Sequence, residues 1–181
     1  MDLLEFPDAA AWEAWLAVHH ADASEAWLRI AKRGSGIATV PINDALDVAL
    51  CWGWIDGQRK SLDAVSFRQR YCPRRPRSSW SQVNVAKVEA LTAAGRMRPP
   101  GLAEVTAAQA DGRWAAAYAS QRTAEVPSDL AAALAAHPRA AAAFDGLGRS
   151  ERYQVILALL RTRTEEGRTR VLTRAIERLE G

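Results

Sequence analysis

Apolar residues near the start of the chain recur with the spacing of a helix. Trp12, Trp15 and Leu16 fall on one face of a helix that this period predicts over residues 9–20. A short apolar segment over residues 26–31 then predicts a strand. The chain therefore opens with a helix and a strand that can share a core.

A second helix and a β-hairpin are predicted next. Pro41 is a favourable first helical residue, and apolar positions over residues 42–50 line one helical face. Gly53 is expected to end this helix. Residues 54–74 predict a hairpin whose turn lies near residues 62–64.

The second strand of this hairpin has the clearest alternation in the chain, because successive side chains of a strand point to opposite faces. Phe67, Gln69 and Tyr71 are predicted to point one way. Arg68 and Arg70 are predicted to point the other way. The alternation therefore places two arginines on one surface.

Helical signals dominate the rest of the chain. Ser79-Trp80-Ser81-Gln82 has the form of a capping box and predicts a helix to about Ala94. Further helices are predicted over residues 101–110, 128–136, 138–144, 150–163 and 164–180, with Ser128, Ser150 and Thr164 as caps. The fold class is α+β: an N-terminal α/β domain (residues 1–115) with a central β-hairpin and flanking helices, followed by an all-helical C-terminal extension (residues 116–181).

Charge is distributed unevenly along the chain. Residues 1–57 carry three basic and nine acidic side chains, whereas residues 58–80 carry seven basic and one acidic. The net charge of +3 therefore conceals a short cationic segment. Because the planar guanidinium of arginine suits carboxylates and phosphates, this segment predicts an anion-facing surface.

Composition also narrows the cellular context. No apolar run approaches the ~20 residues that cross a bilayer, and the acidic N-terminus lacks the pattern of a signal peptide. Cys51 and Cys72 have neither the spacing of a metal site nor that of a disulfide framework. We therefore expect a cytoplasmic protein without membrane insertion, without a metal and without a cofactor.

The stretch Cys51-Trp52-Gly53-Trp54-Ile55-Asp56-Gly57 joins a carboxylate and two indoles to the cationic segment. Together with Ala49-Leu50 it resembles the signature of the YdeI/OmpD-associated family, the bacteriocin-protection proteins. The resemblance covers nearly the whole chain, through Arg59, Leu62-Asp63, Pro73-Arg74, Ser79-Trp80-Ser81, Asn84, Gly95-Arg96-Met97, Gly101, Asp111-Gly112-Arg113-Trp114, Pro127, Asp129-Leu130 and Thr169-Arg170. It implies a role in protection against bacteriocins and membrane-active peptides, and no general catalytic mechanism.

Asp56 is the first candidate site residue. On a strand it shares a face with Trp54 and Gln58, where it can orient a ligand or act as a general acid or base. The structural alternatives are an Asp-Gly turn and an ion pair with Arg68 or Arg70 on the neighbouring strand. The sequence leaves these alternatives open.

The other candidates are aromatic, cationic or small and polar. Tryptophans are usually core residues, but Trp54 and Trp80 adjoin polar residues and are candidate pocket walls. Two arginines on one strand face can hold a carboxylate or phosphate, whereas the loop arginines of residues 74–77 can be simply solvated. The ligand-binding candidates are Trp54, Arg59, Arg68, Arg70, Trp80, Ser81 and Asn84.

We predict that these residues and Asp56 form one cleft that binds a small anionic or peptide-like ligand, in a stress or bacteriocin-resistance context. An enzyme that uses Asp56 and the arginines in the same cleft is the first alternative. An electrostatic module for nucleic acid or an acidic protein is the second. Nucleic acid is the less expected partner, because the sequence contains no known nucleic-acid-binding motif. The oligomeric state and the identity of the ligand are left open.

Overall fold

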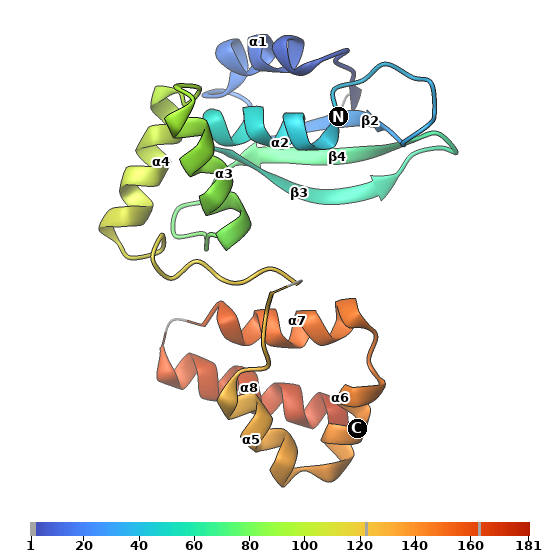
Figure 1. The fold of residues 1–181 in the computed structure, drawn as a ribbon, viewed down its shortest axis with the longest axis vertical. Coiled ribbons are helices and arrows are strands. Elements are labelled where there is room, and N and C mark those ends of the chain that lie inside the picture. The colour runs from blue at the N-terminus through green and yellow to red at the C-terminus, as the bar shows by residue number, and fades with distance from the viewer. Residues whose placement is uncertain (1–2, 122, 163) are drawn as a thin grey trace. The chain divides into compact units, whose positions relative to one another are not determined.

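The computed structural model describes residues 3–121, 123–162 and 164–181. The chain forms two compact units (Figure 1): Met1–Trp80 with Asn84–Ala116, and Ser81–Val83 with Ala117–Gly181. We call them the N-terminal unit and the C-terminal unit. The strands lie in the first half of the chain and the C-terminal part is helical, so the predicted α+β class is confirmed.

A four-stranded sheet forms the base of the N-terminal unit. Its strands are β1 (Leu3–Leu4), β2 (Ala26–Ala31), β3 (Trp54–Ser61) and β4 (Ser66–Pro73), in the order β1-β2-β4-β3. β3 and β4 are the predicted hairpin, and β4 pairs antiparallel with β2 on its other side. β1, which the sequence did not predict, pairs parallel with β2.

Two helices, α1 (Ala9–His19) and α2 (Ile42–Cys51), cover one face of this sheet (Figure 1). Apolar side chains from both helices and from three of the strands meet there. The buried core includes Trp12, Leu16, Leu28, Ile30, Val48, Trp54 and Tyr71. This packing defines a helix-covered face and an opposite face of the sheet.

The helix boundaries of this region follow the predictions closely. α3 (Gln82–Ala93) and α4 (Pro99–Ala110) come after the hairpin. Asp8 caps α1, because its carboxylate accepts a hydrogen bond from the backbone N–H of Ala11 at 2.8 Å. Pro41 is the N-cap of α2 rather than its first helical residue, since its ψ of 144° is extended.

Two glycines allow α4 to approach the end of α2. Gly53 has a φ of 75°, and a Cβ there would lie 3.0 Å from the carbonyl oxygen of Pro100. A Cβ on Gly101 would lie 2.8 Å from the carbonyl oxygen of Leu50 and closer still to that of Cys51. Backbone therefore packs directly on backbone at this junction, which only glycine permits.

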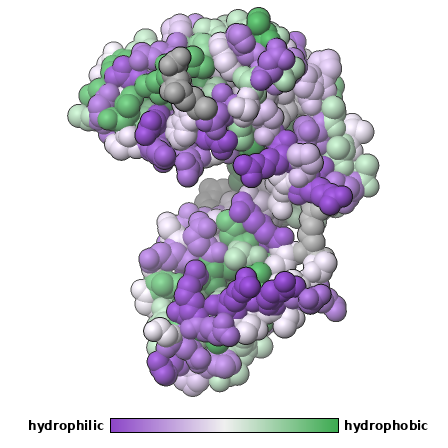
Figure 2. Space-filling view, turned by 180° about the vertical axis from the view of Figure 1, so that it is seen from behind, coloured by the Kyte–Doolittle hydropathy of each residue, from purple (hydrophilic) through white to green (hydrophobic). Residues whose placement is uncertain are grey.

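The main elements of the C-terminal unit are helices. These are α5 (Ser128–Ala136), α6 (Pro138–Gly146), α7 (Arg149–Leu160) and α8 (Glu165–Glu180). They enclose a second core that includes Leu130, Phe144, Val155, Ile156, Leu159 and Ile176. Hydrophobic residues of this unit also reach the surface between hydrophilic side chains (Figure 2). Among the residues that the structure describes, no helix is long and apolar enough to cross a membrane.

Of the three predicted caps in this unit, one is confirmed. Thr164 caps α8 with its side-chain oxygen. Ser128 is the first residue of α5 rather than its cap, and α7 begins at Arg149, one residue before Ser150. Arg163, the predicted end of that helix, lies outside the described residues.

We expect Gly101→Ala to destabilise the protein by about 1–3 kcal/mol, because the added methyl group overlaps carbonyl groups at the end of α2. Helix propensity alone predicts the opposite sign. Urea unfolding followed by circular dichroism measures the change. Gly146→Ala is the matched control, since nothing lies within 4 Å of a Cβ at that position. Equal effects of the two substitutions would contradict the proposed contact.

Candidate functional site

The sheet divides the predicted site residues between its two faces. Directly paired residues of antiparallel strands point to the same face, and Asp56 pairs with Tyr71. Arg68 and Arg70 alternate with Tyr71 along β4 and therefore point to the other face. The structure does not bring Asp56 together with these two arginines, and the ion pair considered as an alternative does not form.

A β-bulge in β3 brings Asp56 and Arg59 to the same face. Residues three apart in a regular strand point to opposite faces, but the register shifts between Asp56 and Arg59, so that Gly57 and Gln58 both lie opposite Arg70. The extra residue turns Arg59 toward the helix-covered face, to which Asp56 already points. Bulges often re-aim side chains in this way next to functional sites.

Gln69 supports the bulge and orients Arg59. Gln69 is 1 % exposed, and its amide nitrogen donates to the carbonyl groups of Gly57 and Gln58 at 3.1 and 3.3 Å. Its amide oxygen accepts a hydrogen bond from Nε of Arg59 at 3.0 Å. The guanidinium of Arg59 also lies 4.6 Å from the centroid of the Phe67 ring. Arg59 is thus held by neutral groups, and no carboxylate within the described residues pairs with it.

Asp56 also has no ion pair within the described part of the chain. The residue as a whole is exposed at the strand, while its carboxyl group is partly desolvated by burial. This loss of hydration raises the pKa of Asp56, while its backbone amide, Arg59 and Arg74 act in the opposite direction. A carboxyl group with a raised pKa can donate a proton as well as accept a hydrogen bond.

A buried hydroxyl group lies on the same face. Tyr71 is 0 % exposed, and its Oη finds no hydrogen-bond partner among the described residues. Burial raises the pKa of Tyr71, and the charge of Asp56 raises it further. An unsatisfied buried hydroxyl costs about 1–3 kcal/mol, which a polar ligand group that reached it would recover. The sequence indicated a core residue here, and the structure confirms that Tyr71 is buried in the core.

The opposite face of the sheet carries a row of cations. Arg68 pairs directly with Arg29 on β2 and with Lys60 on β3, so three basic side chains lie side by side across the sheet. Like charges in directly opposite positions are destabilising. Arg29 is neutralised by Glu5 at 3.2 Å and by Asp63 at 3.0 Å. Arg68 and Lys60 have no such carboxylate within the described residues.

Trp27 lies among these cations. The guanidinium of Arg68 is 5.3 Å and the ammonium of Lys60 is 5.5 Å from its ring centroid. Arg70 instead forms an ion pair with Glu25, whose carboxylate also accepts the indole N–H of Trp27. Hydrogen bonding by Arg70 lowers the pKa of Glu25. Of the two arginines predicted on this face, Arg70 is therefore neutralised, whereas Arg68 contacts the Trp27 ring and pairs with no carboxylate in the described part of the chain.

The two tryptophans predicted as pocket walls belong to packed regions. Trp54 is 1 % exposed and donates its indole N–H to the carbonyl oxygen of His20 at 3.2 Å. Trp80 is 2 % exposed and packs on Trp114, and the guanidinium carbon of Arg74 lies 3.6 Å from the centroid of its ring. Both are structural residues in the positions observed.

Ser81 and Asn84, the last two candidates, are assigned to different units. Ser81 forms a bridge with Tyr118 and belongs to the C-terminal unit. Asn84 lies in the first turn of α3 and belongs to the N-terminal unit. Ser81 is therefore assigned to a different unit from Asp56 and Arg59.

Two protein-family models match the chain, one in its N-terminal part and one in its C-terminal part. Residues 4–104 match the family described as Domain of unknown function (DUF8412), which is more than half of the 181 residues. The chain belongs to the DUF8412 family. Residues 123–181 match a second family, Bacteriocin-protection, YdeI or OmpD-Associated (OmdA), and this confirms the predicted relationship to that family.

The two matches divide most of the residues that carry the resemblance, while Asp111-Gly112-Arg113-Trp114 lies in neither segment. Asp56, Arg59 and the stretch before them lie in the DUF8412 segment, whereas Pro127, Asp129 and Thr169 lie in the OmdA segment. No curated protein and no solved structure matched the chain. Across residues 3–121, 123–162 and 164–181, no group of three or more His, Cys, Asp or Glu side chains is arranged to hold a metal ion.

The raised pKa of Asp56 predicts that Asp56→Asn gains stability relative to the wild type as the pH rises. Folding favours the protonated carboxyl group, so its contribution to folding stability is fully present below the ordinary Asp pKa of about 4. This contribution is lost as the pH rises through the raised pKa of the folded state. Asparagine does not ionise and has no such loss. Urea unfolding of both proteins between roughly pH 3 and pH 7 measures the difference. A difference that stays constant or shrinks with rising pH would show that the carboxyl group is not desolvated.

Proposed function

We propose that the N-terminal unit binds a small anionic ligand at the β-bulge, with Arg59 holding the anion and Asp56 fixing a donor group of the ligand. The ligand would be a metabolite that bears a carboxylate or phosphate, or a peptide-like compound. The observation that carries the proposal is the convergence of Asp56, Arg59 and Tyr71 on one face, which a regular strand would not produce. We also propose the context that the OmdA description names, bacteriocin protection.

Arg59 has the properties of an anion anchor. Its Nε is used by Gln69, so its two terminal nitrogens are left for a ligand. The contacts with Gln69 and Phe67 hold the guanidinium without neutralising it. Because a pre-oriented group loses less entropy on binding, this arrangement favours affinity for a carboxylate or phosphate.

An acid–base enzyme that uses Asp56 is the second candidate. Asp56 has a raised pKa and no ion pair in the described part of the chain, and both properties suit a general acid. Arg59 would stabilise negative charge that develops on the substrate. The two candidates differ in the Asp56→Asn variant, because an enzyme would lose turnover while it kept its affinity for the substrate.

Arg59→Ala should weaken ligand binding by at least about tenfold, because a hydrogen bond to a charged group contributes about 1.5–3 kcal/mol. The probes are inorganic phosphate, a series of mono-, di- and tricarboxylates, phosphate monoesters and short acidic peptides. A thermal-shift screen of the wild type identifies the class of probe that binds. Isothermal titration calorimetry of that probe with the wild type and with Arg59→Ala then measures the loss.

Arg68→Ala is the matched control, since it removes one cation from the opposite face of the same sheet. Binding at the bulge should survive this substitution and should tolerate moderate salt. If Arg68→Ala abolished binding while Arg59→Ala did not, the row of cations would be the binding surface instead. A response only to polyanions, fading steeply with salt, would favour the electrostatic module over a small-molecule site.

A further inference from the structure

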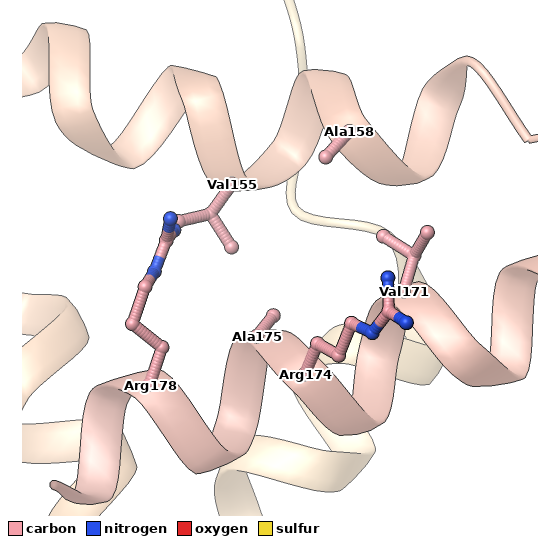
Figure 3. Close-up of a pocket in the computed structure, with 6 residues that line it drawn as sticks. All are labelled: Val155, Ala158, Val171, Arg174, Ala175 and Arg178. Carbon is pink, nitrogen blue, oxygen red and sulfur yellow. The ribbon is translucent and has the colours of Figure 1, made fainter.

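The C-terminal unit has an apolar groove between α7 and α8. Val155 and Ala158 of α7 and Val171 and Ala175 of α8 line it (Figure 3), and its volume is about 220 Å³. Val155 and Ala175 are 2 % and 8 % exposed, whereas Ala158 is exposed, so the groove has a packed floor and an open rim. It is smaller than the roughly 300–1,000 Å³ of a small-molecule site and suits one or two apolar side chains.

Two exposed arginines border this groove. Arg174 and Arg178 lie one turn apart on α8, are exposed and line the groove. Neither forms an ion pair within the described residues, whereas Arg170 on the same helix pairs with Glu166 at 2.9 Å. A bound carboxylate could form a charge-assisted hydrogen bond with either exposed guanidinium group.

We propose that the groove binds an acidic amphipathic helix of a partner protein. The apolar side chains of that helix would enter the groove, and its carboxylates would contact Arg174 and Arg178. Recognition of this kind needs apolar residues three or four positions apart, with Asp or Glu beside them. The proposal concerns the OmdA segment and is independent of the bulge site in the N-terminal unit.

The placement of the two arginines favours a peptide over an amphiphile with one charged head. The Arg178 side chain rises toward Val155 of α7, while that of Arg174 extends beside Val171 of its own helix (Figure 3). The two cations therefore stand at separate ends of the apolar lining. A fatty acid carries a single carboxylate and would contact one of them. A helix that carries several carboxylates along one face can contact both.

A displayed library of helical peptides tests this proposal with the full chain as the target. The peptides would have roughly 16 residues, with leucines at fixed helical spacing and all other positions random. Selection on the wild type should enrich Asp and Glu. Fluorescence anisotropy of a selected peptide should show binding at least about tenfold weaker to Arg174→Ala/Arg178→Ala, because both charge-assisted contacts are lost.

Three further variants locate the site. Arg149→Ala removes an exposed arginine of α7 that is not part of the groove lining, and should leave binding unchanged. Ala158→Glu places a carboxylate at the rim and should block the acidic peptide. Arg174→Glu/Arg178→Glu should change the selected peptides from acidic to basic. Circular dichroism confirms that each variant is folded.

Enrichment of neutral or basic peptides on the wild type would overturn the proposal. So would equal binding of an acidic peptide to the wild type and to Arg174→Ala/Arg178→Ala, or a failure to enrich any helical peptide. If a long-chain fatty acid bound instead, and Arg178→Ala abolished its binding, the groove would belong to an anionic amphiphile and the proposal would be wrong.

Discussion

Gln69 is almost fully buried, and a buried amide needs partners for both its oxygen and its nitrogen. The β-bulge supplies carbonyl groups for the nitrogen, and Arg59 supplies a donor for the oxygen. Satisfying this amide therefore stabilises the irregular strand and fixes the direction of the Arg59 side chain. Were the bulge absent, regular alternation would place Asp56 and Arg59 on opposite faces of the sheet. The geometry of the candidate site thus depends on the hydrogen bonding of a neutral side chain that would contact no ligand.

The elements that the sequence predicted well are those whose signals are local. The period of α1, the alternation of β4 and the glycine after α2 each depend on a few neighbouring residues. β1 gave no signal, because its two residues carry no period and its pairing is parallel with a strand more than twenty positions away. The bulge was equally hidden, since register belongs to a pair of strands and Gly57 alone indicates only a turn.

For the site, the sequence indicated the type of chemistry better than its location. Asp56 and Arg59 were both named as candidates and point to one face of the sheet. Arg68 and Arg70 were expected beside Asp56, but each step along a strand reverses the side-chain direction, and the sheet separates them from it. Trp54 adjoins polar residues in sequence, yet its indole is drawn into the core, where the carbonyl oxygen of His20 satisfies its N–H. Tyr71 was predicted from apolar alternation alone, which says nothing about its hydroxyl group.

The bulge has a second consequence, which concerns contacts between copies of the chain. β3 forms one edge of the sheet, and the other edge, β1, has only two residues. An edge strand offers free N–H and C=O groups that can template pairing with another molecule and start aggregation. Gly57 and Gln58 interrupt that row of groups, and Arg59 and Lys60 place positive charge immediately after the interruption. The irregularity that brings Asp56 and Arg59 to one face therefore also discourages intermolecular strand pairing, so substitutions that straighten β3 would expose the protein to self-association.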